Sequence, residues 1–80
     1  MPPLMISADH ELDLSGLNCP MPLLKAKQAL NRMASGEVLL VVATDPGSER
    51  DFQVFSTQSG VALLRMERDE GAFRYWLRKP

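Results

Sequence analysis

The sequence predicts a small α/β domain with the element order β-α-β-α-β-β, and three observations support this class. The apolar run Val38–Ala43 is too short for a buried helix and rich in β-branched residues, so it predicts a central strand. Segments with apolar residues at helical spacing lie on either side of this run. The C-terminal part contains two strand-like segments separated by a turn sequence, which predicts a hairpin.

The N-terminal half predicts a tail, a strand and a helix. Residues 1–9 contain two prolines and no clear period, and we expect them to form a flexible tail. Alternating polar and apolar residues over 11–14 predict a short strand. Apolar residues at helical spacing over 23–33 predict the first helix. The preceding Pro20 and Pro22 fit its first turn, where a missing backbone N–H group costs little.

The C-terminal half predicts a helix and two strands. Ser48, with Asp51 three residues later, matches the acidic form of a capping box, so we expect the second helix to begin there and to span about ten residues. Residues 61–67 and 73–78 predict strands, and the turn at 69–71 would join them as a hairpin.

The handedness of the chain connections predicts where the two helices begin. Right-handed crossovers would place both helices on one face of the sheet, and both would start at the carboxyl ends of the first two strands. We therefore expect Cys19 to lie close to residues 45–51, although the two are far apart in the sequence.

Length and charge exclude several classes of protein. Eighty residues suffice for one small domain, which we place over residues 10–80. A net charge of −1 gives no electrostatic case for direct binding to nucleic acid or a membrane surface. No apolar run approaches roughly 18 residues, and the N-terminus lacks the basic region of a signal peptide. We therefore expect a cytoplasmic monomer.

The only cysteine, Cys19, is the strongest candidate for chemistry. It lies at the expected start of the first helix, where unpaired N–H groups and a partial positive charge favour a thiolate. This position predicts an exposed nucleophile whose pKa lies below that of a free cysteine. A single cysteine excludes an internal disulfide. One cysteine and one histidine, His10, are also too few for the four ligands of a structural zinc site. We expect no metal and no organic cofactor.

The residues around Cys19 resemble a known signature. The segment 14–22, Leu-Ser-Gly-Leu-Asn-Cys-Pro-Met-Pro, resembles the CPxP motif of the TusA-like (SirA-like) sulfur carriers. The likeness extends over residues 11–79 and includes the Asp-Pro at 45–46, the Arg-Asp at 50–51 and the Arg-Tyr at 74–75. The resemblance implies an α/β two-layer sandwich in which two helices cover one face of a four-stranded mixed sheet of order 1-2-4-3.

The resemblance also implies a function, that of a sulfurtransferase-type carrier. In the family, the CPxP cysteine accepts sulfane sulfur as a persulfide from a donor such as a cysteine desulfurase and passes it to an acceptor protein. Destinations include tRNA thiolation, molybdenum-cofactor maturation and sulfur oxidation. Cys19 would be the persulfide nucleophile, and Pro20 and Pro22 would shape the site. Asp45 and Arg50 match motif positions whose roles the resemblance does not specify.

Simpler interpretations stand beside these. The chain could be a binding or regulatory module in which Cys19 only shapes a surface, or a redox sensor that forms a mixed disulfide. Met21, Asp45 and Arg50 are candidate partner contacts, but Asp45 also suits a helix cap and Arg50 an exposed ion pair. Trp76, on the sheet face that the helices leave uncovered, either docks a partner or packs against arginine stems.

Overall fold

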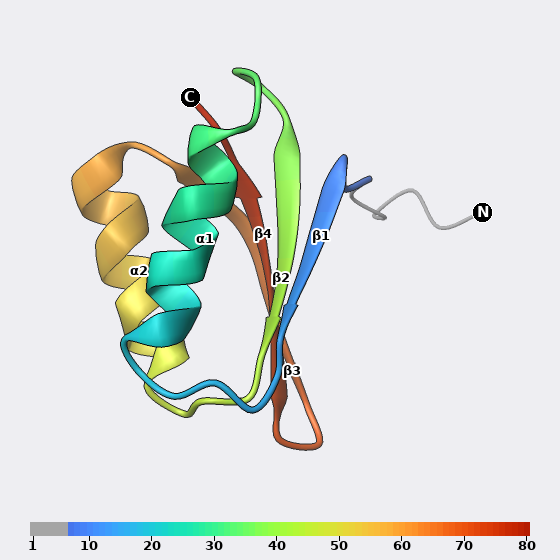
Figure 1. Cartoon of the computed structure of the whole chain (residues 1–80), viewed down its shortest axis with the longest axis vertical. Helices are drawn as coiled ribbons and strands as arrows, with labels where there is room; N and C mark the ends of the chain where they lie inside the picture. Colours follow the sequence, from blue (N-terminus) through green and yellow to red (C-terminus); the bar gives the residue numbers. More distant parts are fainter. Residues whose placement is uncertain (1–6) are drawn as a thin grey trace.

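The computed structural model describes residues 7–80 and confirms the predicted α/β sandwich (Figure 1). The elements follow in the predicted order: β1 (His10–Leu14), α1 (Met21–Asn31), β2 (Val38–Ala43), α2 (Ser48–Ser59), β3 (Ala62–Asp69) and β4 (Ala72–Arg78). Most of the expected tail, residues 1–6, lies outside the described residues. The described end of that segment is anchored, because Asp9 makes a backbone and a side-chain hydrogen bond with Val38.

The four strands form one mixed sheet in the order β1-β2-β4-β3, the order that the family resemblance implied. β1 pairs with β2 in parallel, whereas β4 runs antiparallel to β2 and β3. Figure 1 shows both helices on one side of the sheet, with both helix starts at the same end. Neither helix of residues 7–80 has the length and apolar character needed to cross a bilayer.

The hairpin between β3 and β4 closes through a two-residue turn, Glu70-Gly71. Both residues have positive φ, 49° and 82°, which is the backbone of the tight hairpin turn that matches the twist of the strands. Side chains alternate along β4, and Tyr75 and Leu77 are fully buried against the helices.

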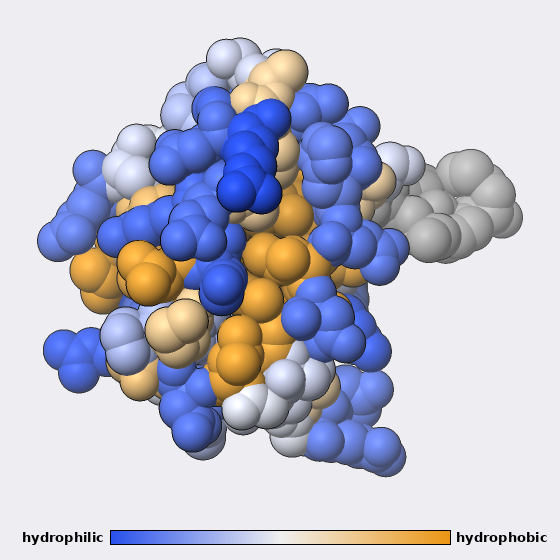
Figure 2. Space-filling view, viewed as in Figure 1, coloured by the Kyte–Doolittle hydropathy of each residue, from blue (hydrophilic) through white to orange (hydrophobic). Residues whose placement is uncertain are grey.

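The core lies between the sheet and the two helices. Ala26 and Leu30 of α1 and Phe52 of α2 pack on the buried face of the sheet, and the Phe52 ring stacks on Tyr75 with 4.6 Å between centroids. Between α1 and β1 the apolar layer reaches the surface in a groove of about 230 Å³, lined in part by Leu12 and Ala29. Figure 2 shows apolar surface between polar groups on this side of the molecule.

Two details of the helix starts differ from the sequence prediction. Pro20 and Pro22 lie at the start of α1 as expected, but Pro22 is fully buried, so this proline is a core residue as well as a helix starter. The capping box expected at Ser48 is wrong. Gly47 is the N-cap of α2, and the buried Ser48 hydroxyl lies 2.7 Å from the Tyr75 hydroxyl. A buried tyrosine hydroxyl needs a polar partner, and Ser48 provides it.

Candidate functional site

Cys19 is exposed in the loop that leads from β1 into α1, as predicted. The peptide bond to Pro20 is cis, and Pro20 itself is the N-cap of α1 without a side-chain cap. Pro20 and Pro22 have no backbone N–H group, and the N–H of Met21 is bound to the carbonyl of Asn18 at 2.9 Å. The start of α1 therefore offers the thiol far fewer free donors than an ordinary helix N-terminus would.

The thiol has a partner from the other helix. Cys19 Sγ donates a hydrogen bond to Oδ2 of Asp51 at 3.3 Å, across 32 positions of sequence. Asp51 lies in the first turn of α2, so the two helix starts meet at one edge of the sheet. This confirms the proximity of Cys19 to residues 45–51 that the handedness rule predicted.

The surroundings of Cys19 shift the pKa of its thiol in the direction opposite to the one predicted from the sequence. The hydrogen bond to Asp51 raises the pKa of the Cys19 thiol above its ordinary value, and partial desolvation and the negative charges of Asp51 and Asp45 act in the same direction. The prediction of a lowered pKa is therefore wrong. The reason is physical: the prolines remove donors that would stabilise a thiolate, while a carboxylate directly facing the sulfur disfavours it.

Asp45 completes the cluster from the loop between β2 and α2. Its Oδ2 is buried and has no hydrogen-bond partner among residues 7–80, and one ligand atom each from Cys19, Asp45 and Asp51 lies within 4.8 Å of the others. Asp45 does not cap α2 through its side chain, because α2 has no side-chain cap and only the Asp45 carbonyl receives the N–H of Ser48. One thiol and two carboxylates are fewer than the four ligands of a structural zinc site.

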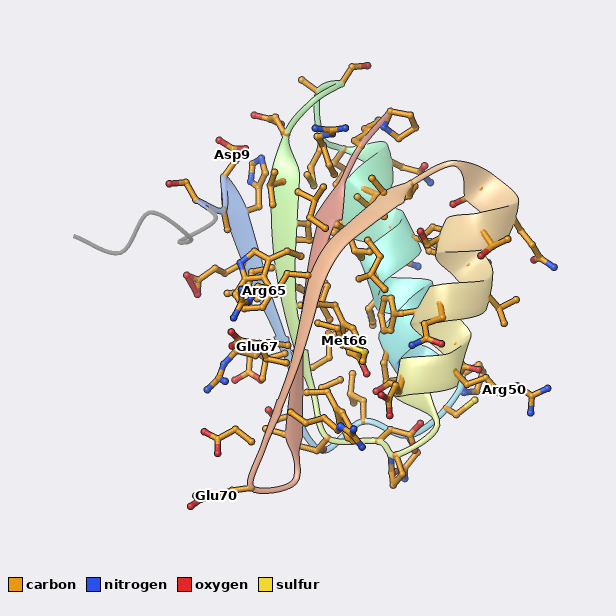
Figure 3. The ribbon with its side chains drawn as sticks, turned by 180° about the vertical axis from the view of Figure 1, so that it is seen from behind. Asp9, Arg50, Arg65, Met66, Glu67 and Glu70 are labelled. Carbon is orange, nitrogen blue, oxygen red and sulfur yellow. The ribbon has the colours of Figure 1, made fainter. Side chains whose placement is uncertain are left out.

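The other predicted contacts lie around this cluster. Met21 follows Pro20 and is 37% exposed, next to the more exposed Leu24 in the following turn. Arg50 precedes Asp51, but its side chain points outward from α2 (Figure 3), and none of the salt bridges among residues 7–80 includes it. Arg50 and Asp51 both line a cleft of about 330 Å³ between the helices, which also involves Leu23, Lys27, Val54, Phe55 and Gln58.

The uncovered face of the sheet has a different character. Trp76 is half-buried there, opposite Leu40 on one neighbouring strand and Arg65 on the other. Arg65 bonds Glu67 at 2.8 Å, and Figure 3 shows both side chains on the side away from the helices. The register thus places one arginine, Arg65, beside Trp76 on this face.

The sequence pattern did not mark Asp51 as the partner of the thiol, because Asp51 also fits a capping box with Ser48. The feature of the sequence that could have predicted this contact is the chain topology, which also places Cys19 near residues 45–51. Of the carboxylates in that segment, Asp51 is the one that receives a hydrogen bond from the cysteine.

Comparison with known proteins identifies the family. Residues 10–79 match the family model for the sulfurtransferase TusA. The chain is 51% identical over 75 residues to the sulfur carrier protein TusA of Allochromatium vinosum, covering 94% of this chain and 99% of that protein. It is 44% identical over 71 residues to the sulfur carrier protein TusA of Pseudomonas putida, covering 89% of each chain.

A solved structure agrees with these sequence matches. The crystal structure of a SirA-like protein from Desulfitobacterium hafniense superposes with a TM-score of 0.75 at 26% identity, covering 86% of this chain and 95% of that one. Since the family model spans nearly all of the described residues and the sheet order is the same as the resemblance implied, the chain belongs to the TusA family of sulfurtransferases.

Proposed function

We propose that this protein is a sulfur carrier that accepts sulfane sulfur on Cys19 as a persulfide and passes it to an acceptor protein. The observation that supports this most directly is the exposed Cys19 at the start of α1, within a CPxP motif, in a chain of the TusA family. Pro20 and Pro22 shape the site, one as the N-cap and the other from the core beneath it.

The cysteine count defines how the sulfur must travel. With a single thiol in the chain, each transfer of sulfur joins Cys19 to a sulfur atom of another molecule. A persulfide exchange of this kind needs a nucleophilic sulfur and close approach, and no organic cofactor. The protein therefore acts as a sulfurtransferase only together with a donor and an acceptor.

The partners follow from this chemistry. We propose a cysteine desulfurase as the donor and a protein of tRNA thiolation or molybdenum-cofactor maturation as the acceptor. The protein would touch the acceptor rather than nucleic acid, and it would work as a monomer. A carrier that relies on a free thiol suits the reducing cytoplasm, where cysteines stay available for exchange.

Met21, Asp45 and Arg50 form the proposed docking surface around Cys19. Two sulfur atoms must come within bonding distance, so the partner must close over the edge where both helices begin. The surface combines one exposed apolar side chain with charges of both signs. A small mixed surface suits a transient complex, which a carrier needs in order to leave one partner for the next.

Intact-protein mass spectrometry tests the proposal. We expect incubation with a cysteine desulfurase and cysteine to increase the mass by one sulfur atom, and we expect Cys19→Ser to remain unmodified. Loss of the added mass on treatment with a thiol reductant would identify it as a persulfide. An adduct only with glutathione would indicate a redox sensor instead, and no modification at all would indicate a binding module.

A further inference from the structure

The carboxylate of Asp51 faces the reactive sulfur directly. We infer that Asp51 is the proton acceptor for Cys19: it takes the thiol proton when the sulfur attacks an incoming persulfide and returns a proton when Cys19 leaves in the next transfer. This assignment rests on the proposed carrier function and adds a second residue to it.

The position of Asp51 is fixed by its own helix rather than by the thiol. Its backbone N–H donates to the carbonyl of Gly47 at 3.1 Å, in the first turn of α2. The next residue, Phe52, is fully buried and stacks on Tyr75. The carboxylate is therefore held 3.3 Å from the sulfur by a helix that is anchored in the core, which is the geometry that a proton acceptor requires.

The other groups of the described residues serve this role less well. Asp51 and Asp45 are the charged groups that act on the thiol, and only Asp51 receives its hydrogen bond. His10, the single histidine, lies at the opposite end of β1 and is bound to Glu37 at 3.1 Å. The backbone at the start of α1 cannot take the thiol proton. Its prolines also have no N–H groups that could stabilise a thiolate.

The loading step then balances. Cys19 Sγ forms a bond to the outer sulfur of the donor persulfide, the donor S–S bond breaks, and its electron pair leaves on the inner sulfur as a thiolate. The proton moves from Sγ to Asp51 and then to the departing thiolate, so no oxidant or reductant is consumed. In unloading, an acceptor thiol passes its proton to Asp51 as its sulfur bonds to the outer sulfur, the S–S bond at Cys19 breaks, and Asp51 returns that proton to the departing Cys19 thiolate.

The geometry predicts opposite effects on two rates when the carboxylate is removed. Asp51→Asn keeps the shape of the side chain but cannot accept the proton. It also removes the negative charge, so the thiol should ionise at lower pH and react faster with iodoacetamide near neutral pH. Loading from glutathione persulfide should nevertheless be slower by about tenfold or more below the pH at which the thiol ionises, and should approach the wild-type rate above it.

Glu49→Gln is the matched control, because it removes the same charge from the same helical turn while its carboxylate lies near Arg68, at 3.8 Å, rather than near the thiol. Asp51→Ser is a second variant that removes the carboxylate and leaves a small polar side chain in its place. Circular dichroism verifies that each variant is folded, and the wild-type protein establishes the loading rate.

The results separate this inference from the proposed function. Slow loading by both Asp51 variants, with fast iodoacetamide labelling and normal loading by Glu49→Gln, would support the role of Asp51. Loading at or above the wild-type rate, or an unchanged labelling profile, would overturn it and leave the carrier function intact. If the wild-type protein itself takes no sulfur from either glutathione persulfide or a desulfurase, the carrier function fails and this role fails with it.

Discussion

The two helices begin side by side but are built in opposite ways. α1 follows an exposed cysteine and has prolines as its N-cap and in its first turn, whereas α2 follows Gly47 and places the buried Ser48 and Phe52 against the core. The exposed start carries the sulfur, and the buried start holds the carboxylate that faces it. The reactivity of the thiol therefore depends on α2, the helix to which Cys19 does not belong.

A cysteine at a helix start is usually expected to have a lowered thiol pKa, but this rule does not apply to Cys19. The rule depends on free N–H groups near the sulfur. In α1 two of these groups are absent because the residues are proline, and a third is used by the loop. The local carboxylates then decide the direction of the pKa shift.

Removing the Phe52 ring, which anchors α2 in the core, should have the largest effect on the stability of the fold. Phe52→Ala deletes a fully buried ring that stacks on Tyr75, and we expect it to lower the free energy of unfolding by about 3–5 kcal/mol. Urea denaturation measures this loss. Val54→Ala, on the same helix but 44% exposed, should change the stability by less than about 0.5 kcal/mol. Equal losses in the two variants would show that α2 is not anchored at Phe52.

Changing the charges at the start of α2 should affect binding rather than folding. We expect Asp45→Lys or Arg50→Glu to weaken donor or acceptor binding by about 1–3 kcal/mol, because both charges border the proposed docking surface. Isothermal titration with a desulfurase measures this, with thermal unfolding as the check on the fold.

Trp76→Ala, on the uncovered sheet face, provides the comparison for that experiment. Its binding should remain close to that of the wild type, since Trp76 lies on the side away from the helices. If instead Trp76→Ala abolishes transfer and both charge reversals have no effect, the partner docks on the open sheet and the proposed surface is wrong.

Changing the start of α1 should have the smallest effect on stability. Cys19 is exposed and contributes little packing, so Cys19→Ser should alter the free energy of unfolding by at most about 1 kcal/mol while abolishing sulfur loading. Urea denaturation of the purified variant tests the first part. A severe loss of stability would mean that the cysteine supports the fold, contrary to its exposure.

The topology was largely predictable from the sequence, because it depends on patterns within short segments. The central strand, both helices and the hairpin each have a local signature, and chain handedness brings Cys19 to residues 45–51. The roles of individual side chains were less predictable. Ser48 binds Tyr75, which is 27 residues away, and the buried Oδ2 of Asp45 has no hydrogen-bond partner in residues 7–80. Neither side chain therefore acts as the local cap that its sequence suggested.

The contact between Cys19 and Asp51 exists only when the two crossovers have closed, so the chemistry of this thiol also reports on folding. A denatured chain presents an ordinary cysteine, whereas the folded chain holds the thiol proton more tightly. By linkage, the pair favours the native state below the pKa of the unfolded thiol, and this contribution is lost as the pH rises through the higher native pKa. A brief pulse of alkylating reagent near neutral pH would thus label unfolded molecules preferentially, and Cys19 would serve as a built-in probe of the folding equilibrium.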